Sequence, residues 1–284
     1  FGLAGLPFFA VAGWVLATGG GLAARSHAAG LLSGGVAATG AAALALALAG
    51  GSAPVLSAAG LVATAVALLG VVAAVFDVPL AQSAGVVAVL AVFLGAFVPV
   101  ISFRLAGMRM PPLPTNAQQL QEGIEPHSSE QVTGRSAVAD SWMSALFAAI
   151  GVICGSALSL LSTDDGLAPD ITAAVFALLL VLHGGRLGSI AQRLALVIPG
   201  AVGATALVVG MAMGLGPWGR EGLVAATLLV TSGVVVAVWT VPGRRMVPYW
   251  GRAGEILHSL SAVAVLPLVL WVLGVYGQLR LMFS

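Results

Sequence analysis

Residues 104–140 read RLAGMRMPPLPTNAQQLQEGIEPHSSEQVTGRSAVAD, and they form the one long polar stretch of this 284-residue chain. On either side of them the sequence consists of apolar runs, so that 60% of all residues are hydrophobic and only 7% are charged. An ordinary soluble domain carries about 25% charged residues. Apolar runs of about 20 residues are long enough to cross the hydrocarbon core of a bilayer as helices. The sequence therefore predicts an all-α fold, a polytopic bundle of transmembrane helices.

The apolar runs number about nine when they are judged by length and hydropathy. They lie at residues 1–18, 28–49, 55–76, 82–103, 141–161, 171–183, 193–215, 221–241 and 256–279. Gly and Pro mark many of the breaks between them, as expected for turns. The polar stretch at 104–140 separates a first group of helices within residues 1–103 from a second group within residues 141–284.

The polar stretch itself has two predicted parts. Met110–Pro114 (MPPLP) is expected to be extended, because proline lacks an N–H and disfavours helix in the residue before it. Further on, Ser128 and Gln131 have the spacing of a capping box. A helix is therefore expected to begin near Ser129 and to continue through Asp140 into the next span.

Arginine indicates which side of the membrane each loop faces. All 11 basic residues are Arg, and three loops collect most of them, at 104–135, 186–193 and 244–252. Nine spans place these three loops on one face and the acidic loop at 164–170 on the other. Because cytoplasmic loops are enriched in basic residues, Phe1 is predicted on the cytoplasmic side of a cytoplasmic (inner) membrane and Ser284 outside. Arg25 and Arg280 then lie on the outer side, against the rule.

The sequence displays no motif of catalytic or cofactor chemistry. It has no G-x-S-x-G nucleophile turn and no H-E-x-x-H zinc motif, and a chain without Lys cannot form a P-loop. A net charge of +1 gives no reason to expect a nucleic-acid partner. We therefore predict that the protein is not an enzyme, with no catalytic, cofactor-binding or metal-binding residues.

Few ionisable groups come close to the predicted spans, and each has a plain interpretation. His27, His183 and Asp77 are expected at solvated helix ends, because each stands beside an Arg, Gly or Pro boundary. The single Cys154 is expected to be a buried, inert thiol. Gly151 and Gly155 have small-xxx-small spacing, as do Gly210 and Gly214, but such pairs arise often by chance in a chain with 38 Gly, so they indicate close helix contacts only weakly.

Two polar clusters are candidate docking sites for partner proteins. The first lies in the central loop, where a Pro-rich segment loses little entropy on binding and Arg side chains flank it near the membrane. The second precedes the last span, and it fits equally a headgroup-level turn anchored by aromatic residues and a docking surface. The candidates are Arg104, Arg109, Pro111, Pro112, Pro114 and Arg135 in the first cluster, and Arg244, Arg245, Tyr249, Trp250, Arg252 and Glu255 in the second.

Three segments of the chain resemble the EccD family, the multispanning membrane component of the mycobacterial type VII (ESX) secretion machine. RLAGMRMPPLP at residues 104–114, with AVAD at 137–140 at a helix start, is similar to this family. PGRRMVPYWGRAGEIL at 242–257 and LPLVLWVLGVYGQLR at 266–280 resemble its C-terminal region. The likeness is recognisable from about residue 82 onward, and upstream it is one of composition only, because Ala/Gly/Val-rich spans look alike.

The resemblance implies a noncatalytic structural subunit. EccD carries a ubiquitin-like cytosolic domain ahead of roughly eleven spans, so this chain, which lacks that domain and starts inside an apolar run, is expected to be a fragment. The family pairs with a second copy of itself around a lipid-lined space. It assembles with the EccB, EccC and EccE components, of which EccC is an FtsK-like ATPase that supplies the energy. The exported proteins are of the WXG100 and PE/PPE types, and membrane lipids are further partners.

A secondary transporter of a small solute is the alternative from another functional class. Such a protein is expected to have inverted repeats with broken helices and a polar site near the middle of the membrane. The sequence displays neither feature, and the resemblance to a secretion subunit is therefore the preferred interpretation.

Overall fold

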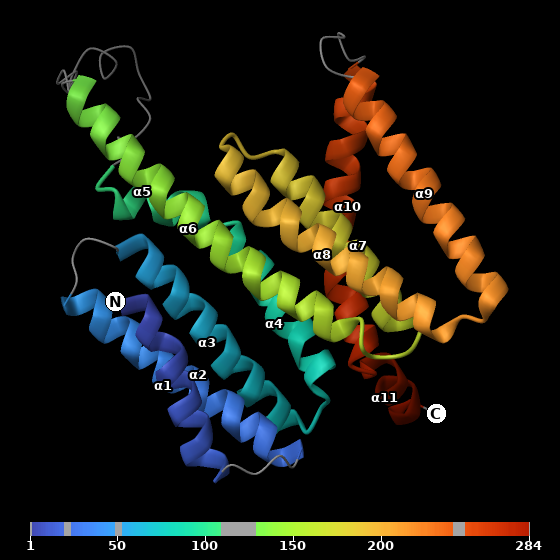
Figure 1. The fold of residues 1–284 in the computed structure, drawn as a ribbon, viewed down its shortest axis with the longest axis horizontal. Coiled ribbons are helices and arrows are strands. Elements are labelled where there is room, and N and C mark those ends of the chain that lie inside the picture. The colour runs from blue at the N-terminus through green and yellow to red at the C-terminus, as the bar shows by residue number, and fades with distance from the viewer. Residues whose placement is uncertain (1, 20–23, 49–52, 109–128, 241–247, 284) are drawn as a thin grey trace.

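The computed structural model describes residues 2–19, 24–48, 53–108, 129–240 and 248–283, and all regular structure within them is α-helical (Figure 1). The predicted all-α class is confirmed. The helices are α1 (Gly2–Thr18), α2 (Ala24–Leu48), α3 (Ala53–Phe76), α4 (Leu80–Gly95), α5 (Val98–Leu105), α6 (Ser129–Leu161), α7 (Leu167–Gly185), α8 (Ile190–Gly214), α9 (Pro217–Thr240), α10 (Pro248–Val272) and α11 (Val275–Met282).

Seven of the described helices are long and apolar enough to cross a membrane, and the number is eight if α4 and α5 form one bent span. Most predicted spans coincide with a helix or with the α4–α5 pair, but α1 is a shorter apolar helix of 17 residues. The run at 256–279, predicted as one span, crosses the break between α10 and α11 at Gly274, whose φ is +70°. The predicted count of nine is therefore approximate. The run at 82–103, predicted as one span, consists of two helices that meet at 55°. Pro99, in the first turn of α5, contributes to this break because proline cannot continue a helical hydrogen-bond ladder.

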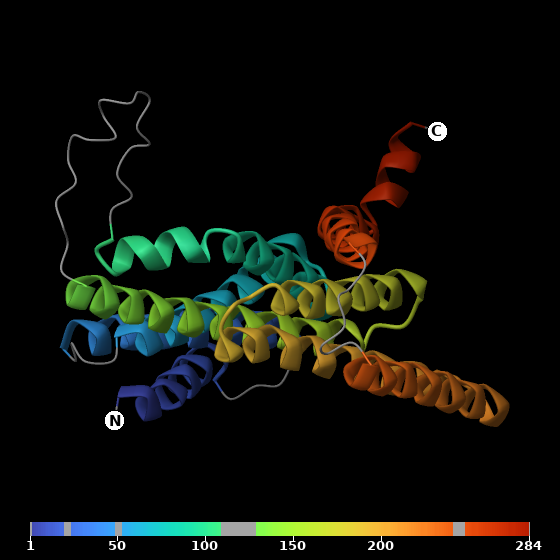
Figure 2. The same ribbon diagram turned by 90° about the horizontal axis from the view of Figure 1, so that it is seen from above.

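Helix α6 is the central element of the bundle. It contacts α3, α4, α5, α7 and α8. It lies between α1–α3 and the later helices in Figure 1, and between α1–α3 and α4–α5 in Figure 2. It is described from Ser129 onward and runs through Asp140 into the span, which confirms the continuous helix predicted there; the predicted cap Ser128 lies outside the described residues. Phe147, Cys154 and Leu158 of α6 are buried in the core, so the expected burial of the single cysteine is also confirmed.

The contact between α6 and α8 depends on glycine. A Cβ atom added to Gly151 would lie 1.9 Å from the carbonyl oxygen of Ala195, and one added to Gly155 would lie 2.9 Å from Cβ of Pro199. The two backbones therefore approach more closely than any side chain allows, and the small-residue pair noticed in the sequence marks a true helix contact. A Cβ atom added to Gly210 would lie 2.8 Å from the carbonyl oxygen of Ser162, but one added to Gly214 would meet nothing within 4 Å.

Helices α1, α2 and α3 form a closely packed group, again through close backbone contacts at glycine. At the α2–α3 contact, a Cβ on Gly35 would lie 2.4 Å from the backbone nitrogen of Ala67, and one on Gly70 would lie 2.4 Å from that of Leu32. On the other face of α2, the Ser33 hydroxyl donates to the carbonyl oxygen of Gly13 in α1 over 2.9 Å. The group joins the rest of the bundle through α3, which contacts α4 and α6.

Helix α9 lies apart from the other helices. Of the helices described, only α8 makes appreciable contact with it, and no residue in its apolar window at Pro217–Val236 is buried. Figure 1 shows it leaning away from the bundle. An apolar helix that the rest of its own chain does not cover is suited to contact lipid or another membrane protein.

Replacement of Gly151 by Ala is expected to destabilise the protein, because the new methyl group meets the Ala195 carbonyl and forces α6 and α8 apart. Overpacking of this kind typically costs about 1–3 kcal/mol. The matched control is Gly233→Ala in the middle of α9, where nothing lies within 4 Å of the new Cβ. Unfolding of the two purified variants in mild detergent measures the difference, and equal stability would show that the helices are not in this close contact.

Candidate docking surface at the arginine-rich end

The two ends of the bundle carry opposite formal charge. One end, where α5 and α7 end and α6, α8 and α10 begin, has Arg104, Arg135, Arg186, Arg193 and Arg252 among the described residues, with Glu130, Asp140 and Glu255. Five arginines against three carboxylates give +2. The other end has Arg25, Arg220 and Arg280 with Asp77, Asp164, Asp165, Asp170 and Glu221. Three arginines against five carboxylates give −2. We call the first the arginine-rich end and the second the acidic end.

Two of the predicted docking residues come together where α5 meets α6. Arg104 is exposed in the last turn of α5. Arg135 is exposed in the second turn of α6, and its Nη1 donates to the carbonyl oxygen of Gly107 over 3.4 Å. Gly107 has φ +70°, a backbone conformation that favours glycine and turns the chain away from α5. The structure therefore ties the start of α6 to the end of α5 beneath the polar loop.

A partly buried hydrogen bond joins α6 and α8 at the same end. Gln192 in the first turn of α8 is buried, and its Nε2 donates to Oδ1 of Asp140 over 2.8 Å. The bond satisfies an amide that would otherwise be costly to bury. Neither partner was distinguished as a bridging residue by the sequence, because the pairing depends on how α6 and α8 face each other.

A second polar contact joins α7 and α10. His183 is half-buried, and its Nδ1 lies 3.1 Å from Nε2 of His258. Nη1 of Arg186 lies 3.3 Å from Nδ1 of His258. The expectation that His183 is simply a solvated helix end is wrong, because it is in contact with a ring from another helix. The sequence holds one indirect signal: His258 is the last ionisable residue of α10, close to the start of its apolar stretch.

The second predicted cluster lies partly on α10. Arg252 and Glu255 are exposed on its first turns. Tyr249 and Trp250 belong to the first turn of the helix, and nothing further is described of their side chains. The remaining candidates, Arg109, Pro111, Pro112, Pro114, Arg244 and Arg245, lie outside the described residues. The described candidates of both clusters lie at the arginine-rich end, so they belong to one face of the bundle.

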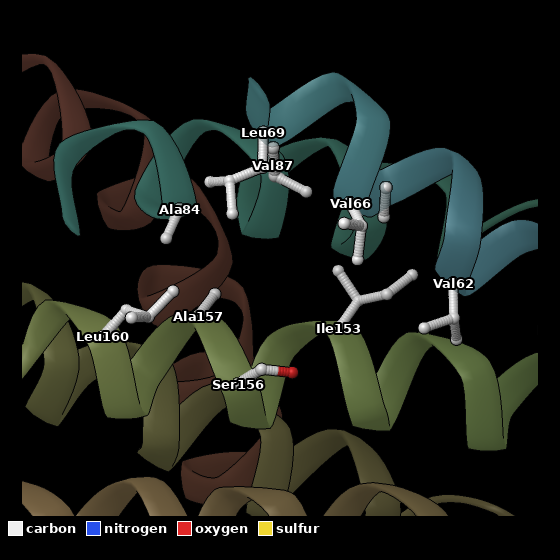
Figure 3. Close-up of a pocket in the computed structure, with 10 residues that line it drawn as sticks. Val62, Val66, Leu69, Ala84, Val87, Ile153, Ser156, Ala157 and Leu160 are labelled. Carbon is white, nitrogen blue, oxygen red and sulfur yellow. The ribbon is translucent and has the colours of Figure 1, made fainter. Parts of the chain in front are cut away.

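The cavities of the described bundle are walled almost wholly by apolar groups. Figure 3 shows one of about 60 Å³, into which Val62, Val66 and Leu69 point from α3 and Ala84 and Val87 from α4, above α6. The one hydroxyl there, on Ser156, already donates to the carbonyl oxygen of Val152. A neighbouring cavity of about 70 Å³ has Thr64 as its one polar lining residue. Neither offers a nucleophile with a base or a set of metal ligands.

A larger hollow of about 650 Å³ opens at the acidic end, beside the α3–α4 turn. His27 and Asp77 line it with six apolar residues. Asp77 has φ +51°, a left-handed conformation that is uncommon outside Gly and Asn and fits a tight turn. Within the described part of the chain, no three His, Cys, Asp or Glu side chains gather closely enough to hold a metal ion.

Loss of the Asp140 carboxylate is expected to destabilise the protein, because the buried Gln192 amide is then left without its acceptor. Asp140→Ala should lower the free energy of unfolding by about 1–3 kcal/mol. Asp140→Asn keeps an oxygen acceptor and should lower it less. Asp165→Ala, at an exposed site of the acidic end, is the control and should stay within about 0.5 kcal/mol of wild type. Denaturation in mild detergent measures all three, and an unchanged Asp140→Ala protein would contradict the bond's role.

Comparison with known proteins identifies a family that the sequence matches and solved structures that share its fold. The sequence matches the family described as the EccD-like transmembrane domain over residues 1–282, and a search of curated proteins gave no match. The structure is similar to protomer 1 of the ESX-3 core complex, with a TM-score of 0.71 and 15% identity over 98% of this chain and 62% of that one. It is also similar to a chain of the MycP5-free ESX-5 inner membrane complex in State II, with a TM-score of 0.55 and 20% identity over 82% of this chain and 61% of that one. This chain thus spans less than two thirds of either.

Proposed function

The chain belongs to the EccD family, whose transmembrane domain it matches over residues 1–282, and from this premise we propose that it is a noncatalytic structural membrane subunit of a type VII (ESX) protein secretion machine. The family match is the observation that carries the proposal. The fold shared with chains of the ESX-3 and ESX-5 complexes supports it. The apolar exterior supports it as well, since α9 has no buried residue in its described apolar window and is suited to contact lipid or a neighbouring subunit.

The arginine-rich end is the proposed docking surface for the other components of the machine. EccB, the ATPase EccC and EccE would bind there, and a second copy of EccD would bind elsewhere on the bundle. Arg is the residue best suited to such a surface, because its planar fork makes two parallel hydrogen bonds to a carboxylate. Exported WXG100 and PE/PPE proteins would meet this chain through the assembled complex.

The arginine-rich end is also proposed to face the cytoplasm. Eight of the 11 arginines of the whole sequence belong to loops and helix ends on this side: the five described ones together with Arg109, Arg244 and Arg245. Cytoplasmic loops are the ones enriched in basic residues. The N- and C-termini lie toward opposite ends of the bundle (Figures 1 and 2), so this orientation has the chain start inside and end outside.

Thiol labelling tests this orientation. On a Cys154→Ala background, a cysteine at Asp165 should react with a membrane-impermeant maleimide in intact spheroplasts. A cysteine at Glu130 should react only after the membrane is permeabilised. Both sites are exposed and lie at opposite ends of α6 or just beyond it. Labelling of the Glu130→Cys protein in sealed spheroplasts would reverse the orientation.

Conversion of Arg104, Arg109 and Arg135 to Lys together tests the docking surface. If these side chains form bidentate contacts with partner carboxylates, the triple variant should recover about fivefold less EccC when the tagged protein is purified in mild detergent, because Lys cannot reproduce the fork. The matched control converts Arg25, Arg220 and Arg280, which belong to the acidic end, to Lys. Equal recovery from both variants would mean that the three arginines contribute charge alone, as toward lipid headgroups.

The transporter alternative has one observation in its favour. The α4–α5 pair is a bent span, and the hydroxyl of Ser102 in α5 is buried without a hydrogen-bond partner among the described atoms. A solute site would need several convergent polar groups, whereas the cavities between the described helices are lined mainly by apolar side chains. The same purification separates the two functions, because a transporter would be recovered without an ATPase.

A further inference from the structure

The contact between His183 and His258 has a geometry that fixes where its protons are. The two rings stack with centroids 5.3 Å apart and an interplanar angle of 22°. Nδ1 of His183 faces Nε2 of His258 at 3.1 Å, and Nη1 of Arg186 faces Nδ1 of His258 at 3.3 Å. The three groups therefore form a short hydrogen-bonded chain from the end of α7 to α10.

The position of each hydrogen in this chain can be assigned in turn, starting from Arg186. A guanidinium group has donors and no acceptor, so Nδ1 of His258 accepts from Arg186. A neutral imidazole has one donor and one acceptor nitrogen, so Nε2 of His258 carries the hydrogen and donates it to Nδ1 of His183. Both bonds exist together only while both rings are neutral.

We propose that the His183–His258 pair is a proton-binding latch, which holds α10 against α7 while it is neutral and releases it when it is protonated. A proton on Nδ1 of His183 would face the N–H of His258. A proton on Nδ1 of His258 would face the N–H of Arg186. Either event replaces a hydrogen bond by two opposed donors and places a second positive charge beside the guanidinium group.

Among the described residues, the surroundings of the pair contain no group that would neutralise the new charge. No described carboxylate is paired with Arg186 or with either imidazole, and the nearest other ring is the apolar Phe147, 6.0 Å from His183. Helix α4 has no titratable residue. The other charged groups on the neighbouring elements are Asp140 of α6, which binds Gln192, and Arg193 of α8, which donates to the carbonyl oxygen of Leu187. The rest are Glu130 and Arg135 in the first turns of α6, Asp170 at the far end of α7, and the exposed Arg252 and Glu255 of α10.

The latch lies at a point where its release would affect the packing of α10. Besides α11, the helices with which α10 makes extensive contact are α7 and α4. The latch lies at the arginine-rich end of the α7–α10 interface, and a weaker contact from Thr172 to the carbonyl oxygen of Leu268, 3.5 Å away, lies toward the other end. Below the imidazoles is a cavity of about 150 Å³ lined by both rings and by apolar residues of α4, α6, α7, α8 and α10. Protonation would therefore loosen the first half of α10 and open this cavity to water.

Hydrogen exchange of the purified full chain in detergent tests the latch, at about pH 7.5 and about pH 5.5, on either side of the ordinary imidazole pKa. After correction for the intrinsic pH dependence of exchange, amides in the first half of α10 and the last turn of α7 should exchange about tenfold faster at the lower pH. Amides in the middle of α6 should not. The measurement does not depend on the secretion function, so the latch and the proposed function stand or fall separately.

The double variant His183→Asn/His258→Gln keeps an acceptor and a donor in place and removes both titratable rings. It should show no pH response at this interface. His27→Gln removes a histidine from the acidic end, and it should respond as wild type does. A full response in the double variant would overturn the latch. If that variant does not fold, the wild-type protein decides alone, since equal exchange at the two pH values would also overturn it.

Discussion

The close approach of α6 to α8 at Gly151 is the contact on which the bundle depends most. Inside a bilayer, helices gain little by hiding apolar side chains, because lipid tails are equally apolar, and they associate through close van der Waals contact instead. At Gly151 the backbone of α6 lies directly against the Ala195 carbonyl of α8. Because α6 also contacts α3, α4, α5 and α7, the placement of the earlier helices and of α7 follows from where it lies. Gly35 and Gly70 allow the same close backbone contact between α2 and α3.

Polar side chains are handled differently in the middle of the bundle and at its ends. In the middle, most hydroxyl groups bond to a carbonyl of their own helix one turn back, as Ser159, Thr205 and Ser261 do, and so they bring no unsatisfied group into the lipid. At the arginine-rich end, side chains bond between helices, as in the Asp140–Gln192 and His183–His258 contacts. Polar groups near a helix end lie close to water and headgroups, so such bonds cost less there. They align α8 with α6 and α10 with α7 without interrupting the apolar core.

Helix positions could be predicted from the sequence, but contacts between helices largely could not. The length of the apolar runs predicts nearly all the helices, because this signal is local. Gly151 and Gly155 were recognisable as a small-residue pair, yet Gly214 has the same spacing and touches nothing within 4 Å. The sequence cannot tell them apart, since the difference depends on which face of α8 meets α6. His183 was misjudged for the same reason: its partner is 75 residues away on α10.

The last two long helices differ in how they are held. Helix α9 needs no partner, because its Thr227 and Thr231 hydroxyls bond to its own backbone and its described apolar residues can face lipid on all sides. Helix α10 is held by the apolar contacts of Val265 and Val269, by Thr172 at one end and by the histidine pair at the other. The position of α10 relative to the core is thus set mainly by its interfaces with α7 and α4, and that of α9 by its contact with α8. A membrane subunit built in this way combines a fixed core around α6 with two helices that are held at few interfaces and can be adjusted without disturbing the core.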